Sequence, residues 1–271
     1  MKDRIIIVNS NCYHGYDFYR AVEGIKKTGF HYTELTSTVG WTEHVSPAES
    51  FKDLLDKKRF LESSNIIPLG FSGHTNLMDK ARIPDFINNI ELAHFFGSKY
   101  IVSSVGEAHI KDRKTTGDDE LIENISSFMD LIEKYDMYFA IETHGEHSRA
   151  ERIKEITDRI KSDRIGICYD TANAIFYGDV EGTEDVKDAC SDINYLHIKD
   201  KAGGRKEWNF PALGDGYVDF PSIFSVLDEN GNSAPLSIEI EFTEKGSSSA
   251  EEVDEALARS ADYLKSLGYT L

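Results

Sequence analysis

Four short apolar segments in the second half of the chain end in side chains that can act as acids, bases or metal ligands. The residues concerned are Glu142, His144, Asp170, His197, Lys199, Glu239 and Glu241. Strand interiors normally carry apolar side chains, because a buried polar group without a partner is costly. Four such endings in succession therefore need a common explanation, and a shared polar site provides one.

A divalent cation fits these residue types. Three carboxylates and one histidine supply three formal negative charges and mostly hard oxygen donors, which suit Mn²⁺, Mg²⁺ or Co²⁺. We expect Mn²⁺, with Mg²⁺, Co²⁺ and Zn²⁺ as alternatives. A structural interpretation stands beside this one: any single acid could form an ion pair with Lys199 or Arg205, and His197 alone could be a hydrogen-bonded core histidine.

The elements that must position these residues alternate along the whole chain. Amphipathic segments predict helices that include Asp17–Thr28, Asp118–Tyr135, Ser148–Lys161 and Ala250–Leu267, with Asp118 or Asp119 available to cap the second of them. Apolar runs rich in β-branched and aromatic residues predict eight strands. These are Ile5–Asn9, His31–Leu35, Ile66–Phe71, Tyr100–Ser104, Tyr138–Glu142, Ile165–Asp170, Ile193–Ile198 and Leu236–Glu241.

Eight strand–helix units predict an α/β fold, a single (β/α)₈ TIM barrel with parallel strands that forms one domain over residues 1–271. A doubly wound open sheet is the alternative. It would usually carry a Gly-rich phosphate-binding turn after the first strand, and Asn9–Gly15 has no such pattern. In a barrel, functional residues lie at the C-terminal ends of the strands, which is where the acids fall.

Composition narrows the classes of function. The chain is 40% hydrophobic and 29% charged, the balance of a soluble globular protein, and it has no apolar run of about 18 residues that would span a membrane. Its first apolar run is too short for a signal peptide, and three irregularly spaced cysteines favour a reducing cytoplasm. The net charge of −18 argues against a nucleic-acid partner.

These motifs, in this order, resemble the xylose isomerase-like barrel superfamily, and more narrowly its sugar phosphate isomerase/epimerase group. The resemblance covers nearly the whole chain and is carried by Ile141–Gly145, Tyr169–Asn173, Leu196–Asp200 and Ser237–Glu239. In addition, Leu213–Phe220 is similar to a Gly-x-Gly-x-x-Asp-Phe stretch that often follows strand seven in the group.

The resemblance implies a small carbohydrate substrate and a metal held by Glu142, Asp170, His197 and Glu239. In the ketose epimerases of this group, the two glutamates also form the acid/base pair. They remove a proton beside a carbonyl and return it from the other face, while the metal stabilises an enediolate. Glu241 shares a strand face with Glu239 and is the alternative ligand.

His144 and Lys199 each lie two residues beyond an expected ligand, on the same inward face, and are candidate general acids, bases or oxyanion partners.

The loop Asp200–Phe220, with Trp208 and Phe210, could form a mobile apolar wall over a sugar, or a packed surface loop or oligomer contact. A homo-oligomer is left open. Candidate substrate residues are His74, Glu107, Asn173, Arg205 and Trp208, although capping or loop hydrogen bonds would also explain the first two. Glu34 in strand two is similarly ambiguous.

Three positions depart from the ketose 3-epimerases: Asn173, Ser148 and Gly203 replace a substrate-binding histidine, a glutamate and an arginine. They weaken that assignment but leave the metal set intact. The expected function is a divalent-metal-dependent sugar isomerase or epimerase that works through an enediolate. The alternative is a metal-dependent lyase or dehydratase of a 3-keto sugar, keto-glycoside or inosose, because loss of a β-leaving group needs the same metal and base.

Two other functions are less compatible with the sequence. An apurinic endonuclease would need further histidine ligands for a zinc cluster and a basic DNA-binding face. A non-catalytic sugar-binding barrel would not need all four ligands.

Overall fold

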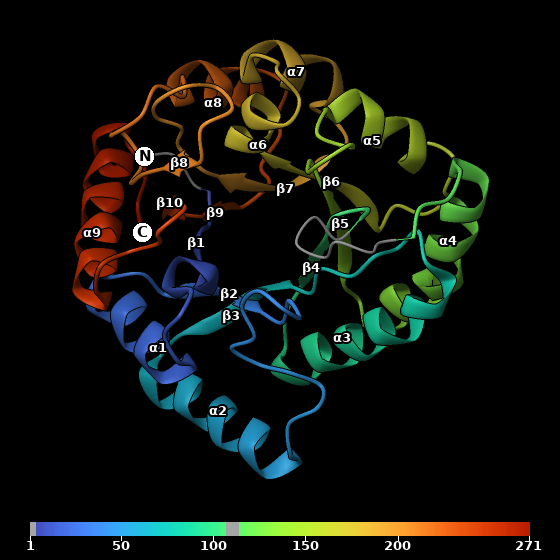
Figure 1. Cartoon of the computed structure of the whole chain (residues 1–271), viewed down its shortest axis with the longest axis horizontal. Helices are drawn as coiled ribbons and strands as arrows, with labels where there is room; N and C mark the ends of the chain where they lie inside the picture. The colour runs from blue at the N-terminus through green and yellow to red at the C-terminus, as the bar shows by residue number, and fades with distance from the viewer. Residues whose placement is uncertain (1–3, 107–113) are drawn as a thin grey trace.

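The computed structural model describes residues 4–106 and 114–271, and its strands form a closed parallel barrel inside a ring of helices (Figure 1). The strands follow one another in chain order, and the last pairs back with the first. They are β1 (Ile6–Asn9), β2 (Tyr32–Thr36), β3 (Ile67–Ser72), β4 (Tyr100–Ser103), β5 (Tyr138–Glu142), β6 (Ile165–Asp170), β7 (Ile193–Ile198) and β9 (Leu236–Ile238). The predicted TIM barrel is confirmed, and the doubly wound alternative is wrong.

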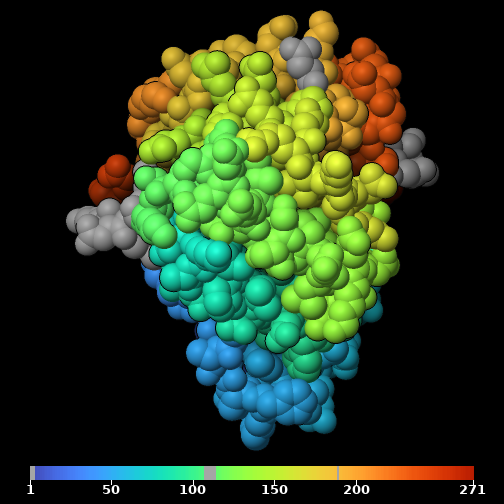
Figure 2. Space-filling model, turned by 90° about the vertical axis from the view of Figure 1, so that its right-hand side faces the viewer, coloured from blue at the N-terminus to red at the C-terminus, as the bar shows by residue number. Residues whose placement is uncertain are grey.

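Helices surround the barrel, and the side chains of α3, α4 and α5 fill much of the outer face seen in Figure 2. Within the described residues, no helix is both long and apolar enough to cross a membrane. The helices are η1 (Ser10–Tyr13), α1 (Phe18–Lys27), α2 (Phe51–Ser64), η2 (Lys80–Arg82), α3 (Ile83–Phe96), α4 (Asp118–Lys134), α5 (Ala150–Thr157), α6 (Thr171–Phe176), α7 (Gly182–Ala189), α8 (Phe220–Glu229) and α9 (Ala250–Ser266).

Alternation along the strands separates two apolar layers. One cluster lies inside the barrel and includes Cys168 and Tyr195. The larger cluster packs between the barrel and the helices and includes Tyr169 and Leu196. Residues two apart in a strand share a face. Asp170 therefore lies on the inward face with Cys168, and His197 lies on the inward face with Tyr195. The three cysteines are all buried and unbonded to one another.

The last barrel strand is shorter than predicted. The sequence predicts a strand as far as Glu241, but β9 ends at Ile238, and Phe242–Thr243 (β10) pairs antiparallel with Asn209–Phe210 (β8). Phe242 has a φ of 58°, in the left-handed region, which a continuing strand does not use. The pairing of β10 with β8, outside the barrel, therefore ends the barrel strand earlier than the alternation of apolar and polar residues predicts.

Two helix predictions also need correction. The N-cap of α4 is Gly117, without a side-chain hydrogen bond, so Asp118 and Asp119 do not cap the helix. Both lie in its first turn, where a negative charge interacts favourably with the helix dipole. The helix predicted over Ser148–Lys161 is confined to α5, Ala150–Thr157.

His44 is a buried histidine whose protonation would destabilise this fold. Its Nε2 donates to the carbonyl oxygen of Tyr16 at 3.1 Å, and its Nδ1 has no hydrogen-bond partner among the described residues. Burial lowers the pKa of His44 to about 4, and the charge of Lys57 adds to the lowering while Asp17 opposes it. A proton at Nδ1 would be a buried charge without an acceptor.

We therefore predict that His44 makes the protein sensitive to mild acid. A histidine with a lowered folded-state pKa contributes its full stability above its unfolded pKa, 6.5, and loses it as the pH falls towards 4. The free energy of unfolding, measured with urea, should fall over this range by up to about 3 kcal/mol more in the unsubstituted protein than in His44→Gln. His31→Gln, at an exposed position, should keep the original pH dependence. Equal pH dependence in both variants would contradict this assignment.

Candidate metal centre

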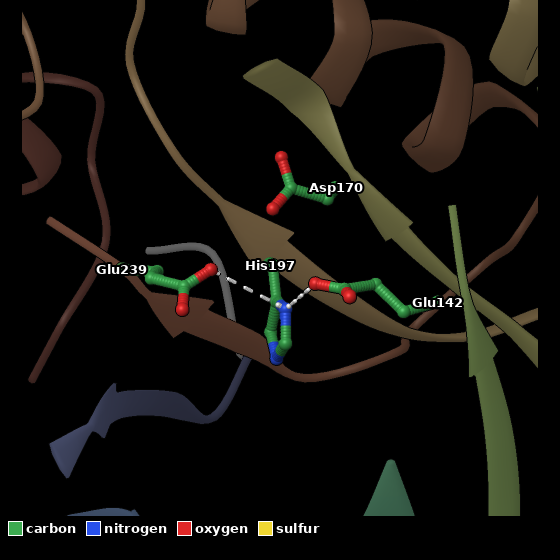
Figure 3. A group of neighbouring side chains, drawn as sticks. All are labelled: Glu142, Asp170, His197 and Glu239. Atoms are coloured by element: carbon green, nitrogen blue, oxygen red, sulfur yellow. Dashed lines mark hydrogen bonds and ion pairs between the residues drawn. The ribbon is translucent and has the colours of Figure 1, made fainter. Parts of the chain in front are cut away.

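Four side chains from neighbouring strands converge at the C-terminal end of the barrel (Figure 3). Glu142 ends β5, Asp170 ends β6, His197 lies in β7 and Glu239 directly follows β9. One potential ligand atom from each lies within 4.8 Å of the others. All four side chains are buried, with at most 6% of any residue exposed. The residues that the resemblance implies as ligands are thus brought together in one group that could hold a metal ion.

Hydrogen bonds orient this group towards a common centre. His197 Nδ1 lies 2.7 Å from Glu142 Oε1 and 3.6 Å from Glu239 Oε2. Asp170 Oδ1 accepts from the backbone N–H groups of Ala172 and Asn173, at 2.9 and 2.8 Å, where α6 begins. Asp170 Oδ2 has no hydrogen-bond partner within the described part of the chain. A buried carboxylate oxygen without a donor is costly, and a cation at the centre would supply its partner.

Electrostatics also fit a cation. Burial raises the pKa of Asp170 well above its usual value, and the charges of Glu142 and Glu239 raise it further, while Lys199 opposes them. A bound divalent cation would reverse this balance, because it favours the ionised carboxylate. Three carboxylates and an imidazole are compatible with Mn²⁺, Mg²⁺, Co²⁺ or Zn²⁺. The residues present therefore fit a metal site.

Lys199 lies beside the group as an ammonium ion. Its Nζ is 2.6 Å from Glu241 Oε2, 3.4 Å from Glu239 Oε2 and 3.9 Å from Asp170 Oδ2. Burial alone would lower the pKa of Lys199, but these three carboxylates raise it well above its ordinary value. Lys199 is therefore suited to donate hydrogen bonds and to supply a fixed positive charge rather than to act as a base. Lys199 thus forms ion pairs of the kind that the structural interpretation predicts. Its single positive charge cannot balance the negative charges of the four carboxylates Glu142, Asp170, Glu239 and Glu241.

Glu34, ambiguous in the sequence, holds the far side of His197. Glu34 is fully buried in β2, and its two oxygens lie 3.0 and 3.1 Å from His197 Nε2. Glu34 Oε2 also accepts from the hydroxyls of Tyr195 at 3.0 Å and Ser237 at 2.6 Å. A metal-binding histidine commonly gives its second ring N–H to such a carboxylate, which fixes the tautomer. Here that arrangement leaves Nδ1 facing the other three ligand candidates.

A cavity opens above the group. Tyr177 forms part of its wall and packs against His144, with ring centroids 4.7 Å apart. The wall also includes Asn11 and Trp41, which no motif in the sequence marks as site residues. Of the sequence-predicted residues, those that line the cavity are His74, Glu142, His144, Asn173, Lys199, Trp208, Glu239 and Glu241.

Arg205 and Phe210 lie outside the lining of this cavity. Arg205 is not among the lining residues of this cavity and forms ion pairs with Asp179 at 2.6 Å and Glu181 at 2.7 Å. Its role in substrate binding stays a prediction without support from this placement. Glu107 lies outside the described residues. Phe210 is buried below the wall, with its ring 5.1 Å from that of Trp208 and 4.6 Å from Lys199 Nζ.

Comparison with known proteins gives a family and several structural relatives. Residues 22–267 match the xylose isomerase-like TIM barrel family. An inosose dehydratase of Serratia proteamaculans (strain 568) is 23% identical over 193 residues, which cover 59% of this chain and 63% of that protein. The chain thus matches less than two thirds of that relative's length.

Two solved structures extend the comparison. The IOLI protein with a bound zinc atom has a TM-score of 0.77 and 21% identity over 100% of both chains. The D-psicose 3-epimerase of Clostridium cellulolyticum H10, solved with D-tagatose, has a TM-score of 0.77 and 14% identity, and the match covers 98% of this chain and 99% of that one. At these identities the likeness shows the fold alone.

We predict that Glu34→Gln weakens metal binding while the barrel stays folded. Loss of the carboxylate leaves the tautomer and orientation of His197 less firmly set, and such changes typically cost roughly 10- to 100-fold in metal affinity. Titration calorimetry of the chelated protein with MnCl₂ measures the Kd directly, without any turnover. Glu62→Gln, at an exposed position of α2, is the matched control. An unaltered Kd in Glu34→Gln, with a native circular dichroism spectrum, would refute this role.

Proposed function

Because the chain belongs to the xylose isomerase-like TIM barrel family, we propose that it is a divalent-metal-dependent isomerase or epimerase of a small carbohydrate. The observation that carries this proposal is the buried group of Glu142, Asp170, His197 and Glu239 below a cavity. The cavity is lined by aromatic side chains together with a few polar and charged groups, as small-molecule sites are. The reaction is the movement of a proton on a carbon beside a carbonyl.

The four residues of this group would hold the metal, which when bound would polarise the substrate carbonyl and offset the charge that develops on its oxygen. Glu142 and Glu239 extend from opposite sides of His197 (Figure 3). One carboxylate can therefore take the proton from one face of the carbon, and the other can supply a proton to the opposite face. Return of the proton to the same carbon gives an epimer, and return to the neighbouring carbon gives an isomer.

Neighbouring side chains set the orientation of the second carboxylate. Asn11 Nδ2 donates to Glu239 Oε1 at 2.9 Å and to Glu241 Oε1 at 3.2 Å. Lys199 Nζ lies on the other side of the same two carboxylates, where its ammonium can also donate to a substrate oxygen. Tyr177 and Trp208 in the wall can pack against the C–H face of a sugar.

Mn²⁺ is the ion that we propose, with Mg²⁺, Co²⁺ and Zn²⁺ as alternatives. The carboxylate-rich donor set favours a hard or intermediate cation. The bound zinc of the structurally similar IOLI protein shows that this fold can carry a divalent ion. For this chain, the choice of ion rests on donor chemistry and is tested together with the substrate.

A lyase or dehydratase acting on a 3-keto sugar, keto-glycoside or inosose is the second candidate. His144 and Lys199 favour it, because both line the cavity near the carboxylates. His144 can protonate a leaving group β to the carbonyl, and the Lys199 ammonium can stabilise the negative charge that develops on it. The similarity to an inosose dehydratase supports the same possibility. Both reactions begin with removal of the same kind of proton and differ in whether a bond to oxygen then breaks.

Deuterium exchange tests the shared first step. The chelated protein is reloaded with each of the four ions and incubated in D₂O with ketoses, ketose phosphates, inososes and 3-keto-glycosides. We expect metal-dependent uptake of deuterium at a carbon beside the carbonyl, with Mn²⁺ giving the fastest rate. Rearranged sugars identify an isomerase, and an unsaturated or dehydrated product identifies a lyase. Stoichiometric metal binding without exchange on any substrate would count against both reactions.

We predict that Glu239→Gln lowers the exchange rate by roughly 100- to 10,000-fold, the usual contribution of a general acid or base. The amide keeps the size of the side chain but cannot accept the proton. The rate should be compared at equal metal occupancy, measured by atomic emission, because Glu239 also belongs to the proposed ligand set. Glu229→Gln, at the exposed end of α8, should exchange at the original rate. Retained activity in Glu239→Gln with full metal dependence would exclude Glu239 as the base.

A further inference from the structure

A second cavity lies directly beside the first and shares part of its wall. Its volume is about 380 Å³, and we call it the outer groove. The two cavities have Trp41, Trp208 and Glu241 in common. The far wall of the outer groove is formed by residues 242–247, which follow β9. A molecule that passes the two tryptophans would therefore reach from the outer groove to the carboxylates.

The shared wall is held in place by stacked rings. The Trp41 and Trp208 rings meet edge to face with centroids 6.4 Å apart. His14 stacks on Trp41 at 4.2 Å, and its Nδ1 lies 2.7 Å from Thr42 Oγ1. Trp208 packs edge-on against Phe210 at 5.1 Å. A wall that is fixed in this way loses little conformational freedom when a ligand binds.

The backbone of the far wall is strained. Phe242 is a bulky residue at a φ of 58°, in the left-handed region that such residues rarely adopt. It is maintained by the pairing of β10 with β8, in which Phe242 lies opposite Phe210. The same pairing ties the far wall to the segment that carries Trp208. Strain of this kind commonly persists where a binding site requires the conformation.

The chemistry of the outer groove suits a sugar ring. Trp41, Trp208 and Phe242 line it with aromatic side chains, against which the C–H face of a sugar can pack. Glu244, Lys245 and Ser247 add polar groups that can meet its hydroxyls. An apolar substituent would contact the aromatic side chains but would form no hydrogen bonds with the polar groups.

We propose that the outer groove is a second sugar-binding subsite, so that the substrate is a two-ring keto-glycoside. Its keto ring enters the catalytic cavity, and its second ring lies in the outer groove between the tryptophans and residues 242–247. This inference rests on the proposed function for the position of the keto ring. The size of the outer groove agrees with it, because about 380 Å³ is within the range of small-molecule sites, about 300–1,000 Å³.

Intrinsic fluorescence offers a direct test, because Trp41 and Trp208 are the only tryptophans in the chain. The Mn²⁺-loaded protein is titrated with D-glucose and D-fructose, with cellobiose, maltose and sucrose, and with phenyl β-D-glucopyranoside. We expect at least one disaccharide to change the emission with a Kd at least 10-fold below that of its component monosaccharides. If no disaccharide binds more tightly than its monosaccharides, the subsite is refuted. If the phenyl glucoside binds more tightly than every disaccharide, the occupant is an aromatic group and the sugar assignment is wrong.

A substitution that fills the outer groove tests the binding of the second ring separately from the binding of the keto ring. In Ser247→Phe the 10-fold advantage of the disaccharide should disappear, while the Kd of the monosaccharide stays the same. Ser63→Phe, at an exposed position of α2, should retain the advantage. Equal weakening of both ligands by Ser247→Phe would overturn the assignment.

Deuterium exchange distinguishes this inference from the proposed function. Exchange on single-ring ketoses, with no disaccharide preference, leaves the proposed function standing and removes the subsite. A disaccharide preference that Ser247→Phe abolishes, without exchange on any keto-glycoside, supports the subsite and removes the proposed reaction.

Discussion

The concentration of negative charge at the C-terminal end of the barrel is the constraint on which the rest of this structure depends. Five carboxylates lie there in a buried network with His197 and Lys199: Glu34, Glu142, Asp170, Glu239 and Glu241. Side chains on a flexible segment would move apart under such repulsion. Here Glu34, Glu142, Asp170 and Glu239 belong to, or directly follow, strands of a closed barrel, so separating them would break the hydrogen bonds between strands. Glu241 directly precedes β10, which pairs with β8 outside the barrel.

Strand register sets the geometry within this network. Asp170 lies level with His197 in the β6–β7 pair, and Glu142 lies level with Cys168 in the β5–β6 pair. Asp170 thus stands two residues beyond the level of Glu142 on the neighbouring strand. His197 also lies level with Ser237, the residue whose hydroxyl donates to Glu34. The backbone pairing of the barrel therefore determines which side chains meet above its apolar interior.

The local pattern of apolar and polar residues was sufficient to predict the strands that carry the site. It was insufficient where pairing with a distant segment determines the end of a strand. The bounds Tyr138–Glu142, Ile165–Asp170 and Ile193–Ile198 agree with the structure, because dense β-branched and aromatic runs end there in polar residues. The alternation Ile238–Glu241 continues the strand pattern beyond Ile238. Its departure from the barrel depends on β8, some 30 residues earlier, and no local feature records that pairing.

The same limit applies to individual site residues. Glu34 meets partners 161 and 203 positions away, so only its inward place in a predicted strand could have marked it. Trp41 lies in a loop whose contact with Trp208 depends on how the whole barrel closes. Arg205 looked available for substrate because the two acids that bind it, Asp179 and Glu181, belong to a loop after a different strand.

Asp170 has both a structural and a proposed metal-binding role, and the structural role limits which substitutions evolution can accept at this position. One oxygen caps α6, and the other faces the centre of the carboxylate group. Loss of an N-cap side chain typically costs about 0.5–2 kcal/mol of stability whether or not any reaction takes place. A descendant that had abandoned catalysis would still be selected to keep this aspartate. Its presence in a related barrel is therefore weak evidence of activity, whereas Glu239, which caps no helix, would be free to vary.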